Sequence, residues 1–278
     1  MAFEAMKVRF FQSGFCTSHS KVIDPRTKFK KIKFAAIWAL IDLPSGGYAM
    51  FDTGYAKHFL TATERFPDRL YRWITPIELN EEETAIAILG KEGIDASQIK
   101  WIVISHFHAD HIAGIKDFPN AQFLCSEAAL NEVLSLRGIA AVKKGILGGL
   151  FPMDFQRRVN TFETVSSQSW INNHGTTCFK WDLTPNITWM LLPGHARGMI
   201  GFEFLQNEKP ILFATDAAWS HDAFKDAILP WPIVKVFIDS MAELGTTWAA
   251  LHRWQQENPQ GEIYFTHCPK TQVLLRHE

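Results

Sequence analysis

Three imidazoles and a carboxylate stand within six positions, in the stretch His106-Phe107-His108-Ala109-Asp110-His111. This stretch follows the apolar run Trp101-Ile102-Val103-Ile104, whose β-branched residues predict a buried strand. A fold rarely needs so many ligating groups at the end of one strand, whereas a transition-metal site does. The chain is therefore predicted to fold so that this stretch meets further ligands from other segments.

Three further ligand candidates lie downstream, each at the end of an apolar, strand-like segment. They are His195, Asp216 and His267. From their spacing alone, each is as consistent with a hydrogen-bonded core residue as with a ligand. Together with the first stretch they supply five histidines and two aspartates, enough for two transition-metal ions that share one carboxylate. Cys268 could be a soft metal ligand. Because the other candidate ligands are mainly histidines, a thiol packed in the core is favoured.

The composition is that of an ordinary globular protein, with 278 residues, of which 47% are hydrophobic and 21% charged. A formal charge of −1 argues against a broad nucleic-acid interface, which would need clustered excess lysine and arginine. The one basic run, within residues 26–33, is interpreted as a solvated loop or a guarded strand edge rather than a docking patch. Because no linker or repeat divides the chain, residues 1–278 are predicted to form a single domain.

The cysteines and the N-terminal segment both indicate a cytoplasmic protein. The four cysteines are widely spaced and form no CxxC pair, so reduced thiols are expected. The first ten residues lack the apolar run of a secretory signal, and no stretch reaches the roughly 18 apolar residues of a membrane span. We therefore expect no membrane partner, and a homodimer is left open.

Strand and helix patterns alternate along the chain. An N-cap at Asn80 with Glu83 three positions later predicts a helix that Gly93 closes. A second amphipathic helix is expected from residue 239 or 240 to 258, and a turn at 207–210. Strands are expected at residues 8–11, 34–43, 48–51, 100–104, 121–125 and 262–265, and a helix at 127–136. This order predicts a mixed α/β (α+β) fold in which two packed sheets are covered by helices.

Residues 138–173 form the least regular section. Glycines and one proline punctuate an apolar segment here, between two groups of candidate ligands. Such a segment is consistent with a lid or pocket-wall insertion. A pair of helices packed on the core fits the pattern equally well.

Several motifs, in the same order along the chain, resemble those of the metallo-β-lactamase superfamily. The stretch 106–111 looks like its HxHxDH signature, and residues 52–54 resemble its early Asp-Thr-Gly loop. Residues 193–198 resemble its PGHxxG motif, while Thr215-Asp216 and Thr266-His267 match its later ligand positions. The resemblance extends over most of the chain and implies a four-layer αββα sandwich with the metals at one edge.

The same resemblance implies a role for each candidate ligand. One ion would be held by His106, His108 and His195, the other by Asp110, His111 and His267, with Asp216 as a bridge. Asp52 would orient a ligand histidine through a hydrogen bond. Zinc is the favoured metal for both positions, with iron, manganese and cobalt as alternatives.

Within the superfamily the chain looks most like the quorum-quenching N-acyl-homoserine lactonases. True β-lactamases generally lack a bridging aspartate, so Asp216 makes that activity less favoured. The resemblance implies a metal-dependent hydrolase that opens a lactone ring, with N-acyl-homoserine lactone as the favoured substrate. A hydroxide bridging the two metals would attack the ester carbonyl, and Asp110 or Asp216 would pass a proton to the leaving oxygen.

Other functions stay open. A thioester hydrolase of the glyoxalase II kind would act on S-acyl-glutathione and would need a basic glutathione-anchoring patch, which the sequence near the C-terminus does not offer convincingly. A β-lactamase-like or non-catalytic metal-binding member of the superfamily is a further alternative.

An apolar pocket for an acyl chain is expected around Phe107, Phe151, Phe155 and Trp219, although plain core packing is the alternative for each ring. Trp219 stands three residues after Asp216, where lactonases of this group commonly place a tyrosine. An indole N–H can donate a hydrogen bond but cannot act as a phenol acid. This difference from the lactonase pattern puts the identity of the substrate in question, not the type of reaction.

Overall fold

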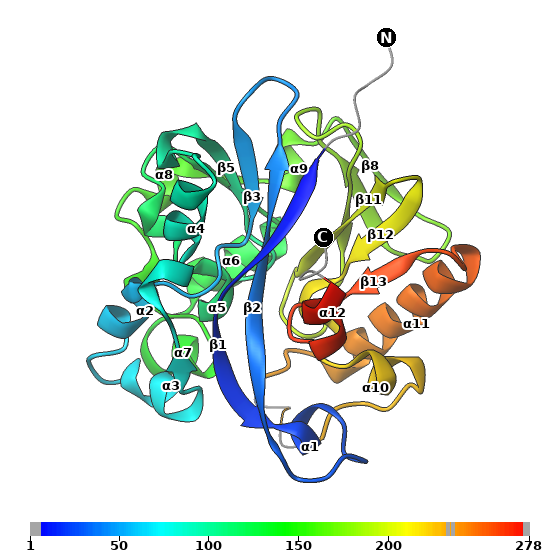
Figure 1. Ribbon diagram of the computed structural model, residues 1–278, viewed down its shortest axis with the longest axis horizontal. Coiled ribbons are helices and arrows are strands. Elements are labelled where there is room, and N and C mark those ends of the chain that lie inside the picture. The colour runs from blue at the N-terminus through cyan, green and yellow to red at the C-terminus, as the bar shows by residue number, and fades with distance from the viewer. Residues whose placement is uncertain (1–6, 232–233, 235–236, 275–278) are drawn as a thin grey trace.

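Two β-sheets packed face to face form the centre of the computed structural model, which describes residues 7–231, 234 and 237–274 (Figure 1). The first sheet has the order β4-β1-β2-β3-β5-β6-β7 and the second β13-β12-β11-β10-β9-β8. The first sheet contains β1 (Val8–His19), β2 (Lys31–Asp42), β3 (Tyr48–Phe51), β4 (Ile77–Glu78), β5 (Ile99–Val103), β6 (Gln122–Cys125) and β7 (Val159–Thr161). The second contains β8 (Gln168–Ile171), β9 (Thr177–Lys180), β10 (Thr188–Leu191), β11 (Ile200–Gln206), β12 (Lys209–Phe213) and β13 (Glu262–Tyr264).

Helices cover the outer face of each sheet, so the predicted four-layer αββα sandwich is confirmed (Figure 1). Against the first sheet lie α2 (Lys57–Ala62), α3 (Arg69–Ile74), α4 (Ala85–Lys91), α5 (Ala109–Ile112), α6 (Glu127–Ser135), α7 (Gly138–Lys143) and α8 (Phe155–Arg158). Against the second lie α10 (His221–Lys225) and α11 (Met241–Glu257), and α12 (Pro269–Leu274) follows β13. The remaining short helices are α1 (Ser20–Ile23), α9 (Phe162–Val165), η1 (Glu81–Glu83), η2 (Ala96–Gln98), η3 (Ile115–Asp117), η4 (Gly148–Leu150) and η5 (Thr215–Ala217).

The long apolar run of β2 is explained by burial on both faces of the first sheet. Trp38 and Leu40 point into the core under the helices, whereas Ile37 and Ile41 point into the core between the sheets. Side chains alternate across a strand, so a strand covered on both sides is apolar throughout. The described helices include none long and apolar enough to cross a membrane.

Aromatic rings fill much of the space between the two sheets. Phe202 of β11 lies with its ring centroid 4.9 Å from that of Phe51, 5.3 Å from Trp189 and 5.7 Å from Phe213. Rings at such separations attract one another in addition to the stabilisation from buried apolar area. This cluster holds the two sheets together, so that loops from both sheets meet at one end.

The first strand is longer than predicted. The sequence predicts a strand over residues 8–11, but β1 continues to His19 alongside β2. The pairing register shifts between Gln12 and Phe15, which marks a bulge. Residues around Ser13 and Gly14 break the alternation of the strand, which is why the pattern appeared to end there.

Two other boundaries also differ from the sequence predictions. The turn expected at 207–210 is confined to Asn207 and Glu208, both with positive φ, and the next two residues already pair in β12. Asn80 accepts a hydrogen bond from Glu82 N and caps only η1, so α4 begins later, at residue 85.

Residues 138–173 combine features of both structures considered for them. The segment contains α7, η4, α8, β7, α9 and β8, so it is more regular than its glycines suggested. Leu147 and Leu150 are buried in the core under the helices. Gly145 approaches a metal-ligand candidate, since a Cβ there would lie 2.5 Å from His108 Cδ2. The segment therefore packs on the core and also reaches the site.

Replacing Phe202 by alanine is expected to destabilise the fold by about 3–5 kcal/mol, because the cavity would lie between the two sheets. Urea unfolding followed by circular dichroism measures this loss. Leu205→Ala, in the same strand but 61% exposed, is the matched control and should change stability by about 0.5 kcal/mol or less. Equal losses in the two variants would contradict this account of the core.

Candidate metal centre

The candidate ligands all lie at one end of the sandwich, in loops that follow strands. His106 and His108 follow β5, and Asp110 and His111 lie in α5. His195 comes from the loop between β10 and β11, Asp216 from η5 after β12, and His267 from the loop after β13. The seven residues are therefore brought together by both sheets.

Close backbone packing holds the loop that carries His195. Gly194 has a φ of +127°, and a Cβ there would lie 2.3 Å from Leu244 N at the start of α11. Ser240 N donates to Gly194 O over 2.9 Å, and Asp239 N donates to His195 O over 3.0 Å. Only glycine fits this position, because any side chain would push α11 away from the loop.

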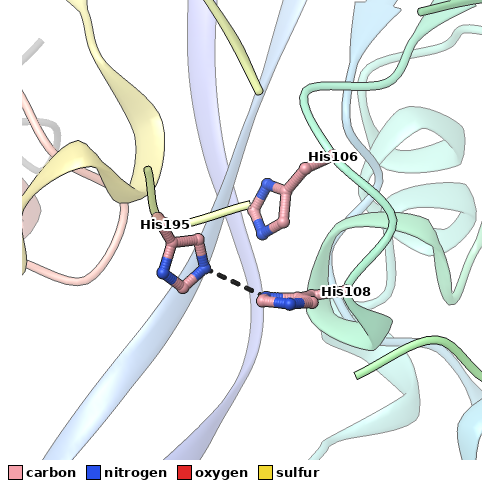
Figure 2. Close-up of side chains that lie close together, drawn as sticks. All are labelled: His106, His108 and His195. Atoms are coloured by element: carbon pink, nitrogen blue, oxygen red, sulfur yellow. Dashed lines mark hydrogen bonds between the residues drawn. The ribbon is translucent and has the colours of Figure 1, made fainter. Parts of the chain in front are cut away.

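The first ligand group is formed by His106, His108 and His195, whose rings face one another in Figure 2. Each offers a nitrogen within 4.8 Å of those of the other two. His195 Nε2 lies 3.0 Å from His108 Nδ1. His106 and His108 come from one side of the site and His195 from the other (Figure 2).

The second ligand group is formed by Asp110, His111 and His267, again with ligand atoms within 4.8 Å of one another. Asp216 lies between the two groups. Its Oδ1 is 3.5 Å from His111 Nε2, and its Oδ2 is 2.9 Å from His267 Nε2 and 3.4 Å from His195 Nε2. This carboxylate is therefore placed to contact both groups, and it also forms a group with His106 and His111.

Three of the five ligand rings, those of His106, His111 and His267, are oriented by a hydrogen bond on the other nitrogen. His111 Nδ1 lies 2.7 Å from Asp52 Oδ2, and Ser105 N donates to Asp52 Oδ1 over 2.8 Å. His106 Nδ1 lies 3.0 Å from Ser105 Oγ, and His267 Nδ1 donates to the main-chain oxygen of Ala35 over 2.8 Å. Such bonds fix which nitrogen faces the metal position.

Burial and carboxylates divide the histidines into two electrostatic classes. Burial lowers the pKa of His108 to about 4 and that of His195 to about 3, so both imidazoles are neutral near pH 7. Burial also opposes charge on His267, but the carboxylates of Asp216 and Asp110 outweigh it and raise its pKa to about 10. The carboxylates therefore attract positive charge to this site, whether as protons or as metal cations.

These residues fit a pair of divalent metal ions. Nε2 of His106 and of His111 is buried without any hydrogen-bond partner among the described residues, and so is Asp216 Oδ1. Leaving a buried polar atom unpaired costs about 1–3 kcal/mol, and metal coordination removes that cost. Imidazole nitrogens and carboxylate oxygens are donors that suit zinc and the neighbouring transition metals.

A cavity of about 250 Å³ lies beside the ligands and is lined by five of them, the exceptions being His106 and His111. Trp219, one of the four aromatic residues proposed for a pocket from sequence, is among its lining residues. Its other walls include Cys16, Phe34, Tyr55, Tyr71 and Ile74. Tyr55 directly follows the Asp-Thr-Gly loop, so its position next to this motif could have identified it as a site residue. Tyr71 has no comparable signal in the sequence.

The other three aromatic residues proposed from sequence do not line this cavity. Phe107, Phe151 and Phe155 contact one another with centroids 4.9–6.0 Å apart, in the core beneath the helices of the first sheet. Cys268 is buried, and its Sγ accepts a hydrogen bond from His221 N over 3.4 Å, as a packed thiol does.

The fold and the site together define an αββα protein with a histidine- and aspartate-rich metal centre between the strand ends of its sheets. Residues 38–237 match the family model described as the metallo-beta-lactamase superfamily. The chain belongs to this superfamily.

The relatives are named as lactonases. N-acyl homoserine lactonase AttM from Rhizobium radiobacter is 26% identical over 188 residues, covering 66% of this chain and 66% of that protein. The matches to AttM lactonases span 48% to 66% of those proteins' own length.

Solved structures share the fold at low sequence identity. An N-acyl homoserine lactone hydrolase with N-hexanoyl-L-homoserine at its metal centre has a TM-score of 0.71 at 16% identity, covering 98% of this chain and 97% of that one. AidC, a dizinc quorum-quenching lactonase, has a TM-score of 0.61 at 15% identity, covering 97% and 89%.

Replacing Asp52 by asparagine is expected to weaken zinc binding about 10- to 100-fold, because His111 loses the acceptor that orients it. Competition with a chromophoric chelator measures the affinity. Asp117→Asn is the matched control, since Asp117 lies 2.7 Å from His58 outside the site, and it should leave zinc affinity unchanged. Undiminished affinity in Asp52→Asn would remove Asp52 from the metal centre.

Proposed function

We propose that this chain is a dinuclear metal-dependent hydrolase that opens lactone rings, with N-acyl-homoserine lactones as the favoured substrates. The observation that carries the proposal is the position of the two ligand groups at the wall of a cavity with largely apolar sides. A reacting carbonyl at the metal centre could thus have its acyl chain beside Phe34, Ile74 and Trp219. The names of the relatives support the same substrate class.

Two bound cations would lower the pKa of a water molecule and polarise the ester carbonyl. The protein supplies the orientation of the ligands and the path of the proton. Asp110 and Asp216 both line the cavity, so either carboxylate can take up a proton and return it to the leaving oxygen. The buried phenols of Tyr55 and Tyr71 have their pKa raised by burial, so they are neutral donors in the cavity wall.

Trp219 is proposed to orient Asp216. Its indole Nε1–H donates to Asp216 Oδ2 over 3.3 Å, and its ring centroid lies 5.4 Å from that of His195. The indole thus contacts the bridging carboxylate and borders the cavity at the same time. It takes a position where the related lactonases commonly have tyrosine, and it acts here on the ligand rather than as an acid.

The charge of the cavity favours a neutral lactone over S-acyl-glutathione. No lysine or arginine among the described residues lines it. Glutathione carries two carboxylates, and the described lining offers no lysine or arginine to anchor them. For this reason a thioesterase of the glyoxalase II kind is the second candidate.

Zinc-loaded protein is expected to open N-acyl-homoserine lactones at least about tenfold faster, by kcat/KM, than it hydrolyses S-lactoyl-glutathione. A pH-stat assay at neutral pH measures both reactions as acid release, with a penicillin as a third substrate. Faster turnover of the thioester would reverse the order of the two candidates. No turnover of any substrate by metal-analysed protein would favour a non-catalytic member.

Trp219→Phe is expected to lower kcat/KM for the preferred lactone about tenfold, because a hydrogen bond to a charged acceptor contributes about 1.5–3 kcal/mol. Steady-state kinetics on zinc-loaded protein measure the change. Trp170→Phe is the control, since this tryptophan is 38% exposed on β8, outside the cavity lining. An unchanged kcat/KM in Trp219→Phe would show that the indole N–H is dispensable.

A further inference from the structure

Three segments lie at one end of the molecule, the lower end in Figure 1: residues 20–30 between β1 and β2 with α1, the end of α3, and residues 226–231 after α10. Thr17 N donates to Pro76 O over 3.1 Å, which joins β1 to the residues after α3. Trp231 N donates to Val22 O over 3.3 Å, which joins the segment after α10 to α1. These two hydrogen bonds place the three segments next to one another.

Large apolar side chains are exposed on each of the three segments. Phe29 is 62% exposed, Trp73 68% and Ile74 61%. Leu229 and Trp231 are 42% and 44% exposed. We call these five residues the interfacial face. Exposed tryptophan, phenylalanine, leucine and isoleucine at one end of a protein mark a surface that contacts an apolar partner.

Basic residues are concentrated on the segment of the interfacial face that lies between β1 and β2. Residues 21–33 contain six basic residues and one acidic residue, Asp24, whose carboxylate is 2.8 Å from the Arg26 guanidinium. Lys28, Lys30 and Lys31 are exposed, and no acidic side chain in the described part of the chain pairs with them. Arg26 pairs with Asp24 and Asp226, and Lys33 with Glu78, so Lys28, Lys30 and Lys31 are the members of the basic run that can pair with an anionic partner.

The cavity of the metal centre opens toward this same surface. Ile74 belongs to the interfacial face and also lines the cavity. Val22 of α1 lines the cavity as well, beside the basic tip of the β1–β2 hairpin. An apolar molecule held at the interfacial face would therefore be next to the mouth of the cavity.

We propose that the interfacial face docks on an anionic lipid surface, with the mouth of the cavity toward the lipid. Aromatic and aliphatic side chains inserted at the headgroup level, flanked by lysines, are the pattern of peripheral membrane binding. No spanning helix is needed for it, so it differs from the sequence expectation of no membrane partner, which rested on hydropathy.

Charge makes a second copy of the chain or a nucleic acid less suitable partners. A two-fold dimer through this face would place each basic hairpin against its own copy. A nucleic acid would pair with the lysines but would leave five apolar side chains exposed around them. An anionic lipid surface satisfies both the lysines and the apolar residues.

Sedimentation of the full chain with phosphatidylcholine vesicles, with and without one quarter phosphatidylglycerol, tests this proposal. We expect binding to the anionic vesicles that falls in 0.5 M NaCl. The variant Lys28→Glu/Lys30→Glu/Lys31→Glu should bind at least about a hundredfold more weakly, since each basic residue near an anionic surface strengthens binding about fivefold and each glutamate adds repulsion.

The matched control for charge is Lys7→Glu/Lys91→Glu/Lys100→Glu, which changes the net charge equally at exposed positions outside the three segments. It should keep at least half of the affinity for anionic vesicles. Trp73→Ala tests the apolar contribution and should lower the affinity at least fivefold. Circular dichroism melts check that the variants are folded.

Equal binding to both kinds of vesicle, or equal loss in the two triple variants, would overturn the proposal. Absence of vesicle binding together with a dimer that Trp73→Ala dissociates would overturn it in favour of self-association. Absence of vesicle binding with retention on heparin would assign the basic run to a polyanion instead. None of these measurements uses hydrolysis, so a failure of the proposed lactonase activity would leave their outcome unaffected.

Discussion

The hydrogen bond between His111 and Asp52 ties the metal centre to the first sheet. Asp52 follows β3 with a φ of 61°, a backbone conformation that non-glycine residues adopt rarely. Its second oxygen accepts from Ser105 N, so one carboxylate fixes both the start of the ligand stretch and its last histidine. Burial raises the pKa of Asp52 and disfavours its charge, while His111 opposes this effect. The ligand ring and the carboxylate therefore depend on each other.

The second sheet completes the site only because the two sheets are packed at a fixed distance. His267 follows β13 in the second sheet, yet its Nδ1 donates to Ala35 O in β2 of the first sheet. Asp216 and His195 also come from the second sheet and face His106 and His108 from the first. The aromatic core between the sheets thus determines the spacing of the ligands within each group, although it lies away from the chemistry.

The ligand set could be predicted from sequence because metal chemistry limits which residues can serve and because the motifs occur in order. The ends of single strands, such as that of β5, could also be predicted, because β-branched residues are followed by polar ones there.

The residues of the cavity wall were harder to predict from the sequence. Phe151 and Phe155 pack against the core and line a separate hollow, whereas Tyr71 of the short helix α3 lines the cavity of the metal centre. Which side of a helix faces a cavity depends on tertiary packing, which local pattern does not encode.

The distribution of charge between the cavity and its surroundings links the two proposals. Inside, the described lining contains carboxylates, imidazoles and apolar side chains but neither lysine nor arginine. Outside, the basic residues of the β1–β2 hairpin stand near the mouth. Lysines at the rim would hold an anionic headgroup outside, while the apolar walls of the cavity favour entry of the neutral, apolar part of a molecule. A protein that admits an uncharged amphiphile from a charged surface needs lysines or arginines outside the cavity and none in its lining. The β1–β2 hairpin places them outside because its tip extends beyond the ends of the strands where the ligands lie (Figure 1).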